Sequence, residues 1–265
     1  ASYTANEDEF IVISLNASDV DGDVLTFSLD SETTPYGSIT INENIVTYTP
    51  ILNFNGDDSF SFNVSDGEFS DSGTITVSVI SINDAPYLTT PDFNILVGED
   101  QEVVFDITDI VIDVDFDYLS VYSVDIPDYG TLEFTGLIGT YTPNADFFGF
   151  DLAHIQIFDG QLFSEELELV FIIEGSNDAP VLDAIADIYF DEDDTYTITA
   201  NATDVDGDEL VYTCISSANI LCFVNGDEIT LTPAPNFNGV ETITLGVQDP
   251  TGEEDTQDVI ITITP

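Results

Sequence analysis

The sequence predicts an all-β protein made of three β-sandwiches in tandem, and three observations support this fold class. Apolar and polar residues alternate in short stretches such as FIVISL, DSFSFNVS and GTITVSVIS, the pattern of half-buried strands. No window of the chain shows the apolar spacing of an amphipathic helix. The same motifs also recur three times in the same order, about 90 residues apart, which indicates a repeat architecture.

The repeats are defined by five anchor motifs. The acidic motif DVDGD begins at Asp19 and at Asp204, and its variant DVDFD begins at Asp113. The other anchors are a Thr-Pro pair ending at Pro50, Pro143 and Pro233, a glycine at Gly56, Gly149 and Gly239, an aspartate at Asp66, Asp159 and Asp249, and NDAP at 83–86 and 177–180. These anchors predict three domains, at residues 1–83, 84–177 and 178–265.

Each predicted domain contains about seven short strands with turn residues between them, the pattern of an immunoglobulin-like Greek-key sandwich. The proline of NDAP cannot donate a ladder hydrogen bond and has a fixed φ, so it suits a short, stiff linker. We therefore expect an elongated array of three sandwiches.

The charge of the chain is unusual, and it excludes several functions. There are 53 Asp and Glu residues, one His and no Lys or Arg, for a formal net charge of −53. Nucleic-acid binding relies on basic residues that neutralise phosphates, so that partner is excluded. Hydrophobic residues make up 43% of the chain and aromatic residues 11%, which argues against disorder. No apolar run is long enough for a membrane span.

The alternating aspartates predict a cation site. Asp113 and Asp115 point to the same side of an extended segment, so both carboxylates can reach one ion. No Lys or Arg exists to pair with them, and a buried unpaired carboxylate costs several kcal/mol. An all-oxygen ligand set without Cys or His clusters favours calcium over zinc or copper. For most of the other acids, we expect a solvated acidic surface.

The order of the motifs resembles the cadherin-like repeats of large bacterial extracellular adhesins and, more distantly, the repeats of animal cadherins. The resemblance covers the whole chain and implies Ca²⁺ bound between consecutive repeats. At the first junction it implies the ligands Glu7, Asp58, Asn83, Asp84, Asp113, Asp115 and Asp159. At the second it implies Glu99, Asp151, Asn177, Asp178, Asp204, Asp206 and Asp249.

By the same matching, Asp19, Asp21 and Asp66 face a preceding repeat, and Glu192 and Glu241 face a following one. The linkers depart from the animal pattern at Ser81, Gly175, Ala85 and Ala179, and Phe116 replaces the motif glycine. We therefore expect one or two ions per junction rather than three.

The function implied is a calcium-rigidified extracellular segment of a stalk, matrix or filament protein. Its expected partners are further repeats of the same or neighbouring chains, end to end, and a cell-surface or matrix component. An enzyme is not expected, because the acids lie periodically at repeat edges rather than in one cleft. The alternative is an accessory carbohydrate- or ligand-binding module of a secreted protein, which would need an aromatic platform in one repeat only.

The two cysteines and the single histidine also carry expectations. Cys214 and Cys222 lie in two strand-like segments around a turn, which predicts a hairpin disulfide in an oxidising compartment or, alternatively, a pair of buried thiols. His154 has no second His or Cys nearby in the sequence, so we expect a packed or surface residue rather than a catalyst.

Overall fold

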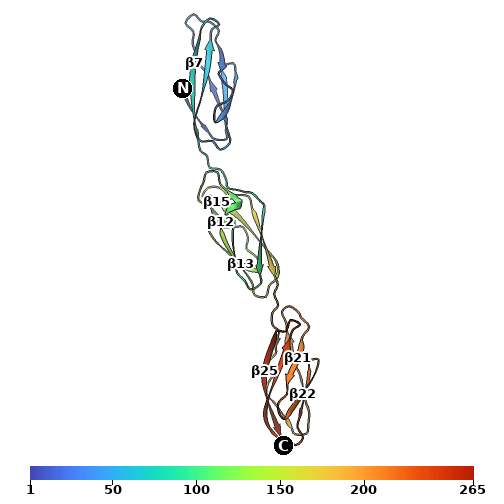
Figure 1. The fold of residues 1–265 in the computed structure, drawn as a ribbon. Coiled ribbons are helices and arrows are strands. Elements are labelled where there is room, and N and C mark those ends of the chain that lie inside the picture. The colour runs from blue at the N-terminus through green and yellow to red at the C-terminus, as the bar shows by residue number, and fades with distance from the viewer.

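The computed structural model describes residues 1–265 as three β-sandwich domains in a row, joined by short linkers (Figure 1). The only helical element is a single 3-10 turn, η1 (Thr108–Ile110). No helix is long and apolar enough to cross a membrane. The all-β fold class and the elongated tandem array predicted from the sequence are confirmed.

Each domain, called repeat 1, 2 or 3 below, pairs a four-stranded sheet with a three-stranded sheet. In repeat 1 the four-stranded sheet has the order β1 (Ser2–Asn6), β7 (Ser70–Ile80), β6 (Gly56–Ser65) and β3 (Thr26–Leu29). The three-stranded sheet has the order β2 (Ile11–Ser14), β5 (Ile45–Pro50) and β4 (Gly37–Asn42). The first strand runs parallel to the last one, and all other neighbours are antiparallel. This parallel pairing places the end of the first strand beside the end of the last one, so the chain leaves each repeat at the end opposite to the one where it enters.

Repeats 2 and 3 have the same two sheets. In repeat 2 the four-stranded sheet consists of β9 (Asp92–Gly98), β16 (Leu167–Glu174), β15 (Gly149–Phe158) and β12 (Ser120–Ser123). The three-stranded sheet consists of β10 (Val103–Asp106), β14 (Ile138–Pro143) and β13 (Gly130–Thr135). In repeat 3 the four-stranded sheet consists of β18 (Ile188–Asp191), β25 (Glu254–Thr264), β24 (Gly239–Gln248) and β21 (Val211–Ile215). The three-stranded sheet consists of β19 (Tyr196–Thr199), β23 (Glu228–Pro233) and β22 (Ile220–Asn225).

Repeats 2 and 3 also contain a short two-stranded pair that repeat 1 lacks. In repeat 2, β8 (Tyr87–Leu88) pairs with β11 (Val111–Ile112), directly before the acidic motif. In repeat 3, β17 (Val181–Leu182) pairs with β20 (Ala202–Thr203) at the same place. In both repeats the first strand of the pair follows NDAP directly, so the linker continues into the sandwich.

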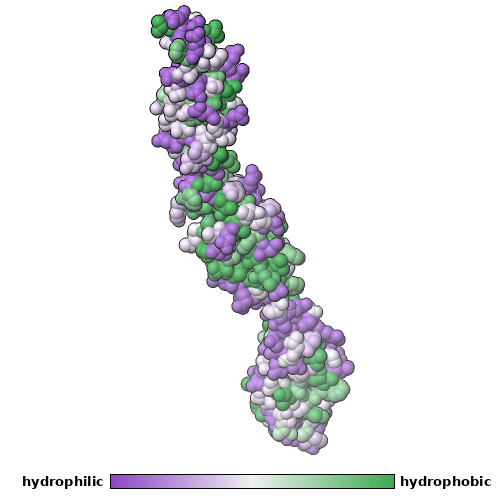
Figure 2. All heavy atoms as spheres, turned by 45° about the horizontal axis from the view of Figure 1, so that its top comes forward, coloured by the Kyte–Doolittle hydropathy of each residue, from purple (hydrophilic) through white to green (hydrophobic).

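Each repeat has its own hydrophobic core between its sheets, built from alternate residues of the strands. The core of repeat 1 has 10 buried residues and the other two have 13 each, and each larger core includes one buried residue of its short pair, Val111 or Leu182. Figure 2 shows hydrophobic residues gathered on the visible face of the middle repeat, while hydrophilic and intermediate residues cover most of the visible face of the first. Separate cores mean that the repeats are held together only through their linkers.

Cys214 and Cys222 form a disulfide, as the sequence predicted. Its position differs from the prediction, because the two strands are not a hairpin pair. Cys214 lies on β21 of the four-stranded sheet, whereas Cys222 lies on β22 of the three-stranded sheet. The bond therefore ties the two sheets of repeat 3 to each other.

Candidate metal centres at the two linkers

At the first linker, a buried glutamate holds the chain as it leaves repeat 1. The residue after β1 is Glu7, only 4% exposed, and its N–H donates to the Ile80 carbonyl at 2.9 Å. Its Oε1 accepts the N–H of Ile82 at 2.7 Å. Because β1 and β7 run parallel, the carboxylate lies at the point where β7 becomes the linker.

The acidic loop of repeat 2 meets the same linker from the other side. Asp115 Oδ2 accepts the N–H of Asp84 at 2.8 Å, and its Oδ1 accepts the Ser81 hydroxyl at 3.1 Å. Asp113 Oδ1 accepts the N–H groups of Asp115 and Asp117, which folds the DVDFD loop. As a result, carboxylate oxygens of Asp113, Asp115 and Asp117 lie within 4.8 Å of one another.

A linker amide makes a third contact with repeat 2. Asn83 Nδ2 donates to Asp159 Oδ2 at 2.9 Å, and Gln161 Nε2 donates to Asn83 Oδ1 at 2.7 Å. Burial alone would raise the pKa of Asp159, but hydrogen bonds from Leu162 N–H, Asn83 and Gln161 N–H outweigh it and lower the pKa. Asp159 is therefore kept ionised beside the linker.

The second linker reproduces these contacts at equivalent positions. Glu99 Oε1 accepts the N–H of Ser176, and Asp206 Oδ2 accepts the N–H of Asp178 at 2.8 Å. Asn177 Nδ2 donates to Asp249 Oδ2 at 2.7 Å. This amide is the main cause of a pKa of about 2 at Asp249.

The second linker also contains three groups of carboxylates whose oxygens lie within 4.8 Å of one another. The groups are Glu99, Asp178 and Asp206; Asp100, Asp146 and Asp178; and Asp204, Asp208 and Asp249. Most of the acids that the resemblance assigned to this junction therefore come together.

Several buried carboxylate oxygens at both linkers have no hydrogen-bond partner. They are Asp84 Oδ2 and Asp113 Oδ2 at the first linker, and Glu99 Oε2, Asp178 Oδ2 and Asp204 Oδ2 at the second. Burial raises the pKa of Asp84, and the charges of Asp8 and Asp115 raise it further. Burial likewise raises the pKa of Asp178, followed by the charges of Asp146 and Glu99. Both pKa shifts reflect ionised oxygens that lack a compensating charge.

These residues fit a hard divalent cation. An unpaired buried oxygen is costly unless a donor or a cation satisfies it, and no donor is present. The only side-chain ion pair, His154 with Asp125 at 2.8 Å, lies within repeat 2 and belongs to neither cluster. The candidate ligand atoms are all carboxylate oxygens, the kind of ligand that calcium prefers.

Two of the expected ligands, Asp58 and Asp151, accept hydrogen bonds inside their own repeats. Asp58 is 5% exposed and accepts the hydroxyls of Thr34 and Tyr48. Asp151 is 3% exposed and accepts the Tyr141 hydroxyl at 2.8 Å together with backbone N–H groups. Neither residue belongs to a carboxylate cluster, because its oxygens are already satisfied inside its own repeat.

The acids at the outer ends do not form clusters of three. In repeat 3, Glu241 accepts both the N–H and the side-chain amide of Asn219, so it has the same internal role as Asp151. Glu192 Oε2 accepts only the Asn238 amide, at 3.3 Å.

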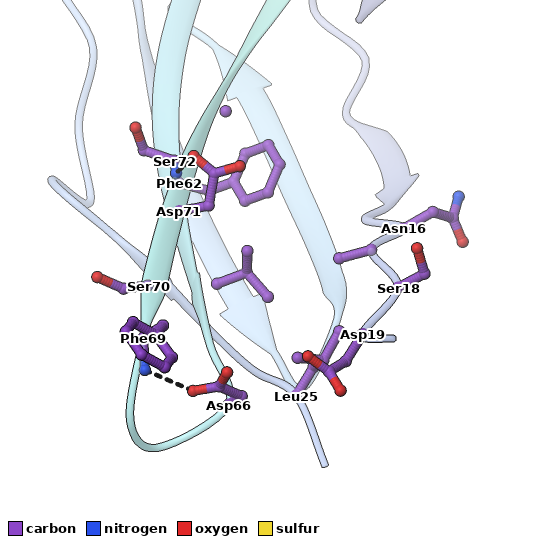
Figure 3. Close-up of a pocket in the computed structure, with 13 residues that line it drawn as sticks. Asn16, Ser18, Asp19, Leu25, Phe62, Asp66, Phe69, Ser70, Asp71 and Ser72 are labelled. Carbon is purple, nitrogen blue, oxygen red and sulfur yellow. Dashed lines mark hydrogen bonds between the residues drawn. The ribbon is translucent and has the colours of Figure 1, made fainter. Parts of the chain in front are cut away.

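At the outer end of repeat 1, aspartates fold turns and border a pocket. Asp19 Oδ1 accepts the N–H groups of Asp21, Gly22 and Asp23. Asp66 Oδ1 accepts the N–H of Phe69 at 2.6 Å, and Asp19 and Asp66 both line the pocket shown in Figure 3. These carboxylates are therefore held in place by turns of their own repeat.

Sequence reasoning missed several members of the clusters. Asp100 and Asp146 both have positive φ, and Asp100 Oδ1 accepts the N–H of Asp146 at 3.1 Å, which brings two turns together at the base of repeat 2. Asp117 and Asp208 form the last position of the acidic motif. That position is acidic in all three copies, so its periodicity was the available signal.

The fold and the acidic linkers together define a tandem array of immunoglobulin-like, cadherin-like repeats. Residues 1–78, 83–168 and 177–262 each match the bacterial Ig domain, so the chain belongs to that family. No curated protein sequence matches the chain.

Solved cadherin ectodomains share the fold. Mouse cadherin-23 EC22-24 matches with a TM-score of 0.60 and 17% identity over 99% of this chain and 95% of that chain. Mouse protocadherin-24 EC1-3 matches with a TM-score of 0.60 and 14% identity over the same shares. The chain also spans 42% of two endo-fucoidan hydrolases of glycoside hydrolase family 107, at 15% and 16% identity, with a TM-score of 0.36, too low to indicate anything about activity.

Proposed function

We propose that calcium ions bind at the two linkers and hold the three repeats in one rod, which serves as a structural or adhesive segment outside the cell. The observation that carries this proposal is the set of five buried carboxylate oxygens without partners, all of them at the linkers. Equivalent linker contacts occur twice in the chain, which supports a common role for both junctions.

The chain's own residues prepare each linker for the ion. Glu7 and Glu99 hold the linker backbone at the base of the preceding repeat. Asp115 and Asp206 hold it from the following repeat through the N–H of Asp84 and of Asp178. A bound Ca²⁺ would neutralise the charge that these carboxylates concentrate, since 53 acids face no Lys or Arg.

The residues proposed as ligands come from both sides of each linker. They are Glu7, Asp84, Asp113, Asp115 and Asp117 at the first, and Glu99, Asp100, Asp146, Asp178, Asp204, Asp206, Asp208 and Asp249 at the second. Asn83 positions Asp159 beside the first group, and Asn177 positions Asp249 within the second. Ligands from two repeats make binding depend on their relative orientation, so binding would also oppose bending.

Two observations support a location outside the cell. Repeat 3 contains a disulfide, which persists in oxidising compartments. The fold is also that of the extracellular cadherin domains 1-5 of protocadherin gamma B2, at a TM-score of 0.58 and 15% identity. Further repeats, in the same or a neighbouring chain, are the proposed partners at the acidic outer end of repeat 1.

The test is small-angle scattering of the full chain with calcium and with a chelator, at equal ionic strength. Extracellular calcium modules have dissociation constants of about 10⁻⁴–10⁻³ M, so millimolar calcium stabilises each site by about 1 kcal/mol. We expect a longer, narrower distribution of intramolecular distances with calcium than without. Magnesium at the same concentration is the control, because it requires smaller and more regular coordination. Identical scattering in calcium, magnesium and chelator would reject the proposal.

A further inference from the structure

In repeats 2 and 3, the segment after NDAP is an integral part of the sandwich. Leu182 of β17 is only 8% exposed and belongs to the core of repeat 3. Its N–H donates to Asp255 Oδ2 at 2.9 Å, and the N–H of Asp183 donates to the Asn201 carbonyl at 2.9 Å. The short strand thus contributes a leucine to the core and two backbone hydrogen bonds to neighbouring segments.

The equivalent place in repeat 1 is open. Residues 16–18 correspond to 201–203, but they are exposed and pair with no strand. Beneath them, Phe62 and Val64 are only half-buried, whereas their counterparts Leu245 and Val247 are 1% and 0% exposed. The part of the sheet that β17 covers in repeat 3 is therefore uncovered here.

A pocket of about 460 Å³ occupies this place (Figure 3). Its floor includes Leu25, Phe62 and Val64, and its two sides are formed by residues 16–19 and 69–73. The floor is apolar and the sides carry free backbone groups and carboxylates, which is the composition of a groove that accepts an extended peptide.

A hydrogen-bond acceptor for such a peptide is already in place. Asp71 lies opposite Val64 in the β6–β7 pairing, as Asp255 lies opposite Val247 in β24–β25. Asp255 accepts the N–H of Leu182, whereas the Asp71 carboxylate, which lines the pocket, accepts only the N–H of Ser72, at 2.8 Å. Asp71 is thus the counterpart of a residue whose role is to hold the inserted strand.

We propose that this pocket binds an extended linker segment, Asn-Asp-Ala-Pro followed by an aliphatic residue and Leu, supplied by another repeat of this kind. The leucine enters the pocket over Phe62 and Val64, and its N–H donates to Asp71. The residue after it donates to the Asn16 carbonyl, in the way that Asp183 donates to Asn201. The unpaired strand edge is thereby covered by strand addition.

The acidic end of the pocket matches the start of the same segment. Asn177 donates to Asp249 and Asp178 N–H donates to Asp206, and the counterparts of these acceptors in repeat 1 are Asp66 and Asp21. Repeat 1 would therefore recognise the segment along its length, through burial of its leucine and through hydrogen bonds to its linker residues. Because the leucine contact involves no ion, the inference goes beyond calcium binding and can fail separately from it.

The first experiment titrates the full chain with a synthetic peptide of residues 176–185, SNDAPVLDAI, at physiological salt, followed by calorimetry and by backbone NMR shifts. We expect saturable binding with shifts at residues 16–19 and 69–73, in chelator as well as in calcium. A peptide carrying Leu182→Asp should bind at least tenfold more weakly, because it replaces the buried apolar side chain with a charge.

The matched protein variants are Asp71→Ala and Asp255→Ala. Asp71→Ala should weaken peptide binding about fivefold, because it removes the acceptor of the leucine N–H. Asp255→Ala removes the same group in repeat 3, whose groove is already filled by β17, so it should leave peptide binding unchanged. Equal affinity of both peptides, or equal effects of both variants, would overturn the proposed pose.

In a second experiment, the linker segment is fused to the N-terminus of the chain, so that it can fill the pocket of repeat 1 from within the same molecule. In the register of repeat 3, residue 185 corresponds to the position directly before Ala1, since Ile188 pairs with Ile261 as Tyr3 pairs with Val77. Adding NDAPVLDAI before Ala1 should raise the melting temperature of repeat 1 and abolish binding of the free peptide. The same extension with Asp in place of Leu should do neither. If the leucine extension leaves both unchanged, or if the unmodified chain instead fills the groove by dimerising, the linker peptide is not the occupant.

Discussion

The side-chain amide of Asn177 lies 2.7 Å from the carboxylate of Asp249, and this contact joins the second linker to the repeat that follows it. The same contact joins Asn83 to Asp159 at the first linker, at 2.9 Å. An amide that donates to a carboxylate neutralises none of its charge. It fixes the direction in which the carboxylate points, and the remaining negative charge is left for a cation.

Asn177→Ala should loosen the second linker and leave the first unaffected. The change removes a hydrogen bond to a charged group, worth about 1.5–3 kcal/mol, without altering the net charge. We expect a broader distribution of distances between spin labels on repeats 2 and 3, even in saturating calcium. Asn63→Ala is the matched control, because Asn63 donates to Asp30 inside repeat 1. Equal broadening in both variants would contradict this role for Asn177.

Replacing Asp113 and Asp115 together by Ala should uncouple repeats 1 and 2 while all three repeats stay folded. Both carboxylates belong to the first linker cluster, whereas the core of repeat 2 lies elsewhere. The measurement is calcium titration calorimetry together with thermal melting. A charge-matched control replaces Asp92 and Glu133, on β9 and β13, by Ala. Unfolding of repeat 2 in the first variant alone would mean that the two aspartates serve the domain rather than the linker.

Asp151→Ala should destabilise repeat 2 and leave calcium affinity unchanged. The substitution leaves the buried Tyr141 hydroxyl and the N–H groups of Asp128 and Tyr129 without their acceptor. An unsatisfied buried donor costs about 1–3 kcal/mol, so the melting transition of this repeat should shift visibly. Tyr141→Phe, which removes only one donor, should cost less. A loss of calcium sites in Asp151→Ala would instead show that Asp151 is a calcium ligand.

Breaking the disulfide should affect repeat 3 alone. Closing so short a loop restricts the unfolded chain and contributes about 2–3 kcal/mol. Cys214→Ser with Cys222→Ser should therefore lower the stability of repeat 3 by that amount and leave the melting of repeats 1 and 2 unchanged. Reduction of the unmodified protein should reproduce the effect of the double variant. A change in all three transitions would mean that the repeats do not unfold independently.

The pair formed by Asp125 and His154 should give repeat 2 a specific acid sensitivity. The N–H of His154 and then its imidazole lower the pKa of Asp125 below its ordinary value of 3.8. A carboxylate with a lowered pKa stabilises the fold above its unfolded pKa, and this contribution is lost as the pH falls through the folded pKa. Asp125→Asn should therefore be less stable than the unmodified chain at pH 6, and the difference should shrink below about pH 4.

The check is thermal melting of both proteins between pH 3 and pH 7. Glu133→Gln is the control, since Glu133 is an exposed carboxylate without a hydrogen-bond partner. A stability difference for Asp125→Asn that does not change with pH would show that the contact is not electrostatic.

The sequence by itself determined the all-β class, the three repeats and the recurrence of acids at their ends. These features follow from local pattern: strand alternation has a period of two, and the acidic motif is a continuous stretch beginning at Asp19, Asp113 and Asp204. Asn83 and Asn177 were also identified, because they lie within a linker motif that occurs twice.

Only the tertiary structure decided which acids are satisfied and which are not. Asp58 and Asp151 occupy motif positions, yet Tyr48 and Tyr141 reach their oxygens from a neighbouring strand of the other sheet. Asp100 joins Asp178 only because turns distant in the sequence meet at the base of repeat 2.

The open groove of repeat 1 likewise depends on what lies over Phe62 and Val64, two residues that alternate as ordinary core positions in the sequence. The physical reason is common to these cases. A residue's own periodicity specifies the face on which it lies, but burial, pairing and charge compensation depend on partners that the chain brings together only when it folds.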